Sequence, residues 1–184
     1  MERKEFEEAL AKKRTLLLTG EITREKAIVI RDRLLSLNSQ SDEEIKLIID
    51  SPGGEVVAAL LLHDILLLLT APVTCIVNGE CSSSGVVILQ GAQKRVATKR
   101  SFFYLHPISI SFEKEPIVID EKAEEKFKDK LRGVKERQKF LYDILIKKTG
   151  RSLKEIKEKE EKLMFAEEAK EFGLIDEVIE KYKI

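Results

Sequence analysis

Short apolar runs alternate along the chain with longer segments that have helical periodicity. Runs rich in Ile, Leu and Val and bounded by Gly, Pro or polar residues are typical of buried strands. Such runs occur at residues 16–18, 45–49, 73–77, 94–98 and 102–105, and a strand or edge segment is expected at 174–179. Helices are predicted at residues 27–37, 56–69, 85–90, 121–148 and 166–172, with another beginning after Ser152 and a short helix or frayed end at 1–13. This alternation predicts an α/β fold with a largely parallel sheet in a single domain, residues 1–184.

Two of the predicted helices carry apolar surface that calls for a partner. Residues 56–69 are apolar nearly all round, so this helix must be covered on most sides, in part by another subunit. The long helix at 121–148 has a narrow apolar seam suited to a partner helix or to its own domain. The seam consists of Phe127, Leu131, Val134, Leu141 and Leu145, with Gln138 in the gap.

Charge and composition exclude several classes of partner. The chain is 43% hydrophobic and 36% charged, with 33 basic and 33 acidic residues. It therefore has no basic field for nucleic acid or an anionic membrane, and its most apolar window is too short to span a bilayer. No secretory signal peptide is apparent, so a cytoplasmic location is expected. Cys75 and Cys81 lack zinc-site spacing with the histidines and are interpreted as buried, reduced thiols.

Two glycine-containing turns each follow an apolar strand and precede an apolar helix. The first is Asp50-Ser51-Pro52-Gly53-Gly54, and the second spans residues 79–85. A junction of this kind presents free backbone N–H groups at a helix start, where negative charge is stabilised. Two such turns side by side, one carrying a hydroxyl, could attack an acyl group and hold its oxyanion.

The candidate nucleophiles and bases are few. Ser82, Ser83 and Ser84 lie in the second turn, and a serine needs a base within hydrogen-bond reach to become nucleophilic. Of the two histidines, His63 lies inside the apolar helix and is expected to pack there, whereas His106 ends a strand. His106 is the base available at neutral pH. A Ser–His pair is therefore a hypothesis, and its alternative is a serine-rich turn with no chemistry.

Residues 15–179 resemble the proteolytic subunit of the Clp protease, a serine peptidase of the ClpP/crotonase fold. The matching stretches are Leu18–Glu21, Ile49–Gly54, Gly79–Gly85, Leu105–Pro107, Thr149–Gly150 and Ala166–Asp176. The resemblance implies a head at about 15–107 and 149–184, and a handle at about 108–148. It also implies Ser83 as nucleophile, His106 as general base, and the N–H groups of Gly54 and Ser84 as oxyanion donors. No metal or organic cofactor is implied.

The third member of the implied catalytic triad is an acidic residue whose position is ambiguous. Alignment on Ala166–Asp176 places it at Glu161, whereas counting from Thr149-Gly150 favours Glu158 or Glu160. The family has Asp here, and this chain has no Asp between Thr149 and Phe165. A glutamate can orient an imidazole as an aspartate does. The alternative is that these glutamates belong to a solvated helix face.

Other departures from the family's pattern concern the residues around the site and the segments used for assembly. Ser84 stands where the family usually has Met, which leaves the choice between Ser83 and Ser84 as nucleophile open. No residue separates His106 from Pro107, and the segment after them lacks the family's Gly-rich stretch. The resemblance implies a homo-oligomer that acts on polypeptide substrates, either a single heptameric ring or two heptamers stacked through the handle. An AAA+ unfoldase is a candidate partner, although residues 1–14 do not resemble the family's N-terminal pore loops.

Three functions are consistent with these features. The first is a self-compartmentalising or ATP-dependent serine endopeptidase. The second is a catalytically inactive ring subunit that assembles with an active paralogue, which the missing Asp favours. The third is a crotonase-type acyl-CoA enzyme, which would leave the pairing of Ser83 with His106 unexplained.

Overall fold

A computed structural model describes residues 2–109 and 120–182 and contains a seven-stranded sheet. The strands are β1 (Thr15–Thr19), β2 (Ile45–Ser51), β3 (Val73–Ser82), β4 (Lys94–Thr98), β5 (Phe102–Tyr104), β6 (Leu163–Phe165) and β7 (Glu177–Ile179). The order β1-β2-β3-β4-β7 is parallel throughout. β5 runs parallel to the end of β3, and β6 pairs antiparallel with β5.

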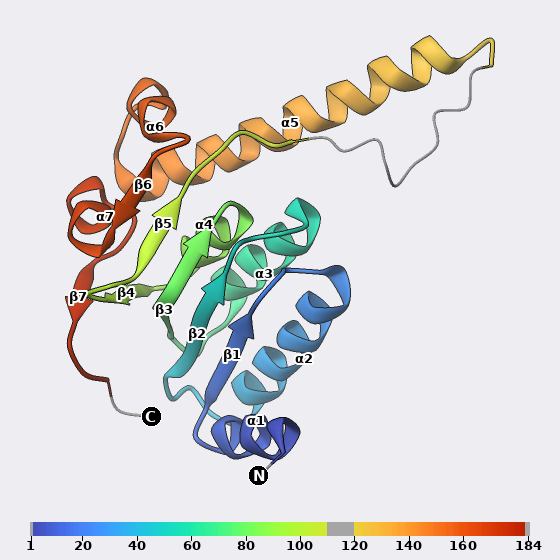
Figure 1. The fold of residues 1–184 in the computed structure, drawn as a ribbon. Helices are drawn as coiled ribbons and strands as arrows, with labels where there is room; N and C mark the ends of the chain where they lie inside the picture. Colours follow the sequence, from blue (N-terminus) through green and yellow to red (C-terminus); the bar gives the residue numbers. More distant parts are fainter. Residues whose placement is uncertain (1, 110–119, 183–184) are drawn as a thin grey trace.

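Helices flank this sheet, and one of them projects from it (Figure 1). They are α1 (Arg3–Lys12), α2 (Arg24–Gln40), α3 (Val56–Leu68), α4 (Ser84–Leu89), α5 (Ala123–Thr149), α6 (Leu153–Lys159) and α7 (Ala166–Phe172). α2, α3 and α4 lie along one face of the sheet, and most of α5 extends beyond it. Within the described ranges, no helix combines the length and hydrophobicity needed to cross a bilayer.

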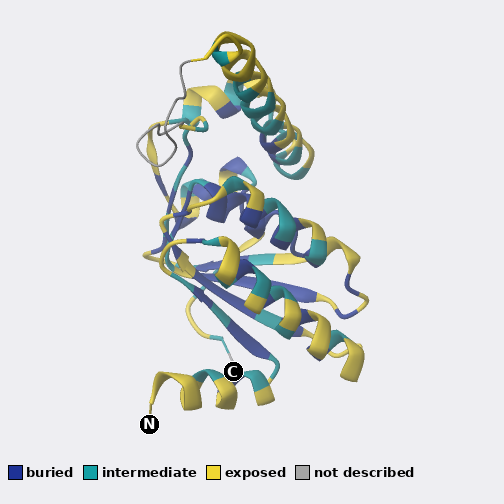
Figure 2. Ribbon diagram, turned by 90° about the vertical axis from the view of Figure 1, so that its right-hand side faces the viewer, coloured by how far each residue is buried: buried dark blue, intermediate teal, exposed yellow. Residues whose placement is uncertain are grey.

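The main core lies between the sheet and the helices α2, α3 and α4. Alternate residues of each strand point to opposite faces, so Leu47 and Ile49 join this core while Ile48 points away from it. Ile48 joins a smaller cluster on the other face, against which Tyr182 of the C-terminal segment packs. Figure 2 shows the strands as the most buried part of the domain.

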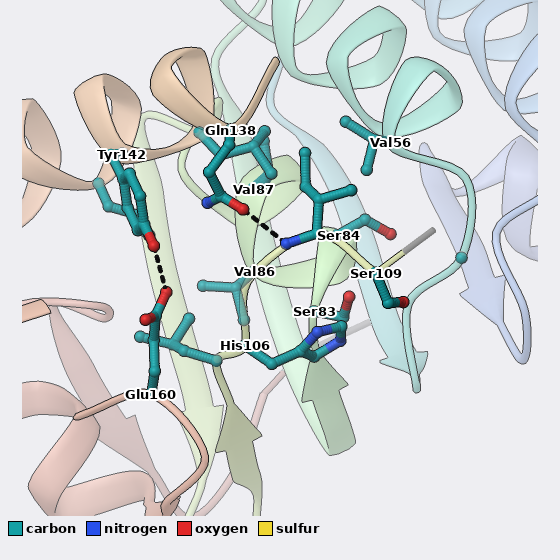
Figure 3. A pocket seen from close by; sticks show the side chains of 15 residues that line it. Val56, Ser83, Ser84, Val86, Val87, His106, Ser109, Gln138, Tyr142 and Glu160 are labelled. Atoms are coloured by element: carbon teal, nitrogen blue, oxygen red, sulfur yellow. Dashed lines mark hydrogen bonds between the residues drawn. The ribbon is translucent and has the colours of Figure 1, made fainter. Parts of the chain in front are cut away.

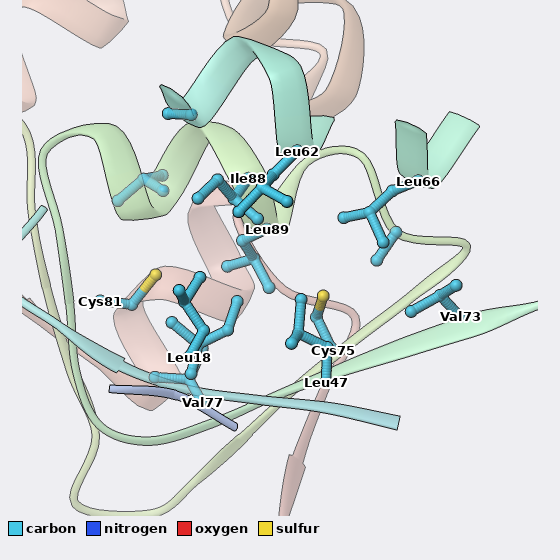
Figure 4. Close-up of a cluster of buried hydrophobic side chains, with 14 of the residues drawn as sticks. Leu18, Leu47, Leu62, Leu66, Val73, Cys75, Val77, Cys81, Ile88 and Leu89 are labelled. Carbon is cyan, nitrogen blue, oxygen red and sulfur yellow. The ribbon is translucent and has the colours of Figure 1, made fainter. Parts of the chain in front are cut away.

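Both cysteines lie in the main core, as expected for structural thiols. Cys75 and Cys81 are fully buried and unpaired, and Figure 4 shows them among Leu18, Leu47 and Leu89. Burial raises the pKa of Cys75 to about 12 and raises the pKa of Cys81 well above its ordinary value. Because the reactive species is the thiolate, both thiols are inert at neutral pH.

The predicted α/β fold is correct, and two elements differ from the sequence prediction. β3 does not end at Val77 but continues through Gly79 to Ser82, because β5 pairs with this extension. The Glu80 N–H also donates to Asp50 Oδ1 at 2.9 Å. β6 was not predicted at all: its three residues become a strand only because β5 lies beside them. The part of the expected handle that precedes the long helix, from residue 108 onward, lies mostly outside the described residues.

Candidate active site

The pairing of β3 with β5 brings Ser83 and His106 to the same edge of the sheet. Ser82 is opposite Tyr104 in the parallel register, and the Ser83 N–H donates to the Tyr104 carbonyl at 2.7 Å. His106 follows two residues later. Because both strands end here, the two side chains emerge together (Figure 3).

Ser83 sits in a sharp strand-to-helix turn. Its φ of 53° and ψ of −125° are unusual for a residue with a Cβ, and α4 begins at the next residue. The Ser83 side chain is half-buried. The hydroxyl oxygens of Ser82 and Ser84 are buried, and neither has a hydrogen-bond partner among the described residues. Of the three hydroxyls, that of Ser83 is therefore the one open to a substrate.

Ser83 and His106 line one small cavity of about 80 Å³. Gly54 and Ser84, the two expected oxyanion donors, line the same cavity. Ser84 is the first residue of α4, so its N–H has no acceptor within that helix. In Figure 3 the imidazole of His106 lies beside the Ser83 hydroxyl.

The Gly53-Gly54 turn is held against Ile22, in the segment after β1, and against Ser83 at distances that only glycine permits. Gly54 has a φ of 150°, and a Cβ there would lie 2.2 Å from the Ile22 carbonyl oxygen. Gly53 has a φ of 99°, and a Cβ there would lie 2.6 Å from the Cβ of Ser83. Backbone hydrogen bonds of 2.8 Å join Ile22 to both sides of the turn, through Gly53 and Glu55. The turn is thus a rigid platform beside the serine.

The hydrogen bond that His106 makes determines which ring nitrogen is free. Its Nδ1 lies 2.7 Å from the Pro107 carbonyl oxygen. A carbonyl only accepts, so Nδ1 carries the proton and Nε2 of the neutral ring keeps its lone pair. This is the tautomer that a general base requires. Pro107 thus occupies the position that a carboxylate would take in a complete triad.

The structure places the three candidate glutamates differently. Glu160 lines the cavity, and its Oε1 accepts a hydrogen bond from the Tyr142 hydroxyl at 2.8 Å. Glu161 is exposed and absent from the lining, although its backbone N–H donates to the Leu105 carbonyl at 2.8 Å. Glu158 is exposed and lies 3.9 Å from Lys154. Only one of the three therefore shares the cavity with His106.

Two residues of α5 were not predicted for the site. Gln138 and Tyr142, one helical turn apart, both line the cavity, and Gln138 Oε1 accepts the Ile108 N–H at 2.5 Å. The signal for Gln138 was present, because it interrupts an otherwise apolar seam. No such signal marked Tyr142 in the sequence, because a tyrosine beside Leu141 is equally consistent with a residue that only packs against the domain.

His63, the other histidine, lies away from this cavity. It is buried in α3, and its Nδ1 lies 2.9 Å from Asp64 Oδ1. The expectation that His63 packs within the apolar helix is confirmed.

Comparisons with known proteins agree with this architecture. A family model described as Clp protease matches residues 2–182. A solved structure of a ClpP1 mutant from Listeria monocytogenes is similar, with a TM-score of 0.80 and 24% sequence identity. The similarity covers 96% of each chain.

Proposed function

The chain belongs to the Clp protease family and has the ClpP fold, and from this premise we propose that it is a serine endopeptidase that cuts unfolded polypeptides. One observation carries the proposal. Ser83 and His106 line a single cavity, with the imidazole tautomer that leaves Nε2 free. No cofactor is needed for this chemistry.

The proposed reaction follows the serine-peptidase template. Ser83 Oγ attacks the carbonyl carbon of the substrate, and His106 Nε2 takes the hydroxyl proton. The N–H groups of Gly54 and Ser84 hold the oxyanion. The C–N bond then breaks, and the imidazolium gives its proton to the leaving amine. A water molecule, deprotonated by His106, hydrolyses the acyl-enzyme and restores Ser83.

We assign the third role to Glu160 instead of Glu161. Glu160 lines the cavity, whereas the Glu161 side chain is exposed outside it. A carboxylate beside the imidazole would stabilise the imidazolium that forms during both proton transfers.

Members of the Clp protease family generally assemble into rings. We extend this to a homo-oligomer of heptamers in the cytoplasm, with the segment 108–148 as the handle. A ring chamber would restrict access to unfolded chains. An AAA+ unfoldase remains a candidate partner and is not required for the cleavage of short peptides.

Labelling with a fluorophosphonate tests the nucleophile. The Ser83→Ala variant is expected to lose labelling and peptide hydrolysis, and His106→Gln to lose both by at least about a hundredfold. Ser82→Ala is the matched control, because it removes a neighbouring hydroxyl that is buried and outside the cavity lining. Labelling that persists at full rate in Ser83→Ala would contradict the proposal.

The second candidate is a catalytically inactive ring subunit. It is favoured by the contact of His106 Nδ1 with the Pro107 carbonyl, because no carboxylate of the described part of the chain is then bound to Nδ1. This candidate predicts normal assembly together with no hydrolysis of short unstructured peptides and no labelling of Ser83. Hydrolysis by the wild-type homo-oligomer would exclude it.

A further inference from the structure

The carboxylate of Glu160 lies in the candidate active site but is bound to a different partner from the one that the mechanism requires. It accepts the Tyr142 hydroxyl at 2.8 Å, while His106 Nδ1 donates to the Pro107 carbonyl. Tyr142, Glu160 and His106 all line the same cavity. Figure 3 shows the Tyr142–Glu160 pair on one side of the cavity and the imidazole, with Ser83, on the other.

The backbone that carries Glu160 is tied to the strand that carries His106. The Glu161 N–H donates to the carbonyl of Leu105, the residue before His106, at 2.8 Å. Glu161 also has a φ of 59°, so the turn is a tight one in the left-handed region. The Glu160 N–H is bonded to Ile156 at 3.2 Å. Because both peptide groups are held by hydrogen bonds, the Glu160 carboxylate can exchange Tyr142 for His106 only by rotation of its side chain.

We propose that Tyr142 is a positioning residue that controls Glu160, holding its carboxylate away from His106 until the side chain rotates onto Nδ1. In this structure the Tyr142 hydroxyl binds the Glu160 carboxylate, and the Pro107 carbonyl accepts the hydrogen bond from the His106 imidazole in place of that carboxylate. When Glu160 moves, Nδ1–H transfers its hydrogen bond from the Pro107 carbonyl to the carboxylate. The proposal rests on the proposed function, since it concerns the same Ser83–His106 site.

The surroundings of Tyr142 favour this hydrogen bond. Burial, and after it the Glu160 carboxylate, raises the pKa of Tyr142 well above its ordinary value, so the hydroxyl remains a donor at neutral pH. Lys157 Nζ lies 5.6 Å from the centre of the Tyr142 ring and adds positive charge on that side. Tyr142 is therefore a neutral hydrogen-bond donor to the Glu160 carboxylate. A positively charged imidazolium can displace it, because a hydrogen bond between two charged groups is stronger.

The other ionisable groups nearby have partners elsewhere or face solvent. Lys159 is paired with Glu168 at 2.5 Å, and the Glu161 side chain is exposed. On the strand side, the centre of the Tyr104 ring lies 6.0 Å from that of the His106 ring. Among the residues that the structure describes, Glu160 is thus the carboxylate best placed to change the proton affinity of His106.

The decisive experiment measures the pKa of His106 by NMR in a Ser83→Ala background. The chain has two histidines, so His63 serves as an internal reference in the same spectrum. Tyr142→Phe is expected to raise the pKa of His106 by about one unit, because the freed carboxylate stabilises the imidazolium. The double variant Tyr142→Phe/Glu160→Gln should lose that rise. Tyr182→Phe, a tyrosine in the small cluster on the far sheet face, is the matched control and should change nothing.

Kinetics provide the second readout, in the chain with Ser83 intact. Tyr142→Phe is expected to accelerate fluorophosphonate labelling on the order of tenfold near neutral pH. It should also move the acidic limb of the pH profile upward, following the His106 pKa. Glu160→Gln should cancel both effects, which a purely structural role of Tyr142 would not predict. Circular dichroism verifies that each variant is folded.

The two proposals fail in distinguishable ways. If Ser83 never reacts but the pKa of His106 still responds to Tyr142 and Glu160 as described, the peptidase assignment falls and the role of Tyr142 stands. If Tyr142→Phe leaves the pKa unchanged or lowers it, or if the double variant keeps the rise, the role of Tyr142 is overturned.

Discussion

At the scale of single residues, the glycine turn shows how closely the backbone approaches the nucleophile. Gly53 lies in the left-handed region, with no room for a Cβ beside Ser83. Gly53→Ala is therefore expected to destabilise the fold by about 2 kcal/mol or more and to abolish Ser83 labelling. Chemical denaturation followed by circular dichroism measures the first effect, since the chain has no tryptophan.

Gly133→Ala is the matched control for that substitution. Gly133 lies within α5, where a Cβ would meet only the flexible end of the Arg137 side chain at 3.7 Å. Alanine should stabilise the helix there by about 1 kcal/mol without changing labelling. Equal behaviour of the two variants would mean that the turn at Gly53 tolerates a side chain.

At the scale of elements, an ion pair joins β4 to the start of β7. Asp176 accepts hydrogen bonds from the backbone and the guanidinium of Arg95, which also donates to the Gly173 carbonyl at 3.0 Å. Partial burial acts to raise the pKa of Asp176, but the hydrogen bonds and charge of Arg95 outweigh it and lower the pKa below its ordinary 3.8. The folded state therefore binds the Asp176 proton more weakly than the unfolded state does. The resulting stabilisation is fully present above the ordinary pKa and is lost as the pH falls through the lower pKa of the folded state.

Asp176→Asn tests this linkage. The variant should have a lower free energy of unfolding than the wild type at pH 7, and the difference should shrink toward about pH 2. Urea denaturation at a series of pH values measures it. Glu177→Gln is the control, because the Lys94–Glu177 pair is more than half exposed on both sides and should contribute less than about 1 kcal/mol. A difference between Asp176→Asn and wild type that does not depend on pH would contradict the assignment.

At the scale of the whole molecule, α3 has an apolar face that its own domain leaves uncovered. One side of the helix is buried in the core, whereas Val57, Leu67 and Leu68 are 51%, 50% and 76% exposed. Large apolar side chains exposed along one helix, two of them consecutive, are typical of a subunit interface. We therefore expect a second copy of the chain to cover this face.

Leu68→Asp should weaken self-assembly, because it would bury a charge in that interface. Light scattering after size-exclusion chromatography measures the mass of the assembly. Lys154→Asp, at a side chain that is 86% exposed on α6, introduces the same aspartate with a larger change in charge away from α3 and should leave the mass unchanged. An unchanged mass for Leu68→Asp would exclude this face from the interface.

The sequence alone determined the features that depend on local chemistry. Apolar runs bounded by Gly and Pro specify strands, and the position of His106 at a strand end indicated the base. The choice of Ser83 among the three serines of its turn came from the resemblance to the Clp protease family, and both residues line the cavity. Such signals are readable because each depends on neighbours along the chain. They could not separate Glu158, Glu160 and Glu161, which are chemically equivalent within one charged segment.

Only the tertiary structure shows that Glu160, and neither Glu158 nor Glu161, lines the cavity, and that Tyr142 lines it as well. The direction in which each carboxylate points depends on the turn at Glu161, and that turn is held by a hydrogen bond to Leu105, far away in sequence. β6 and the extension of β3 likewise exist because β5 lies between them. Contacts between distant segments leave no periodicity in either segment, so their consequences appear only when the chain is folded.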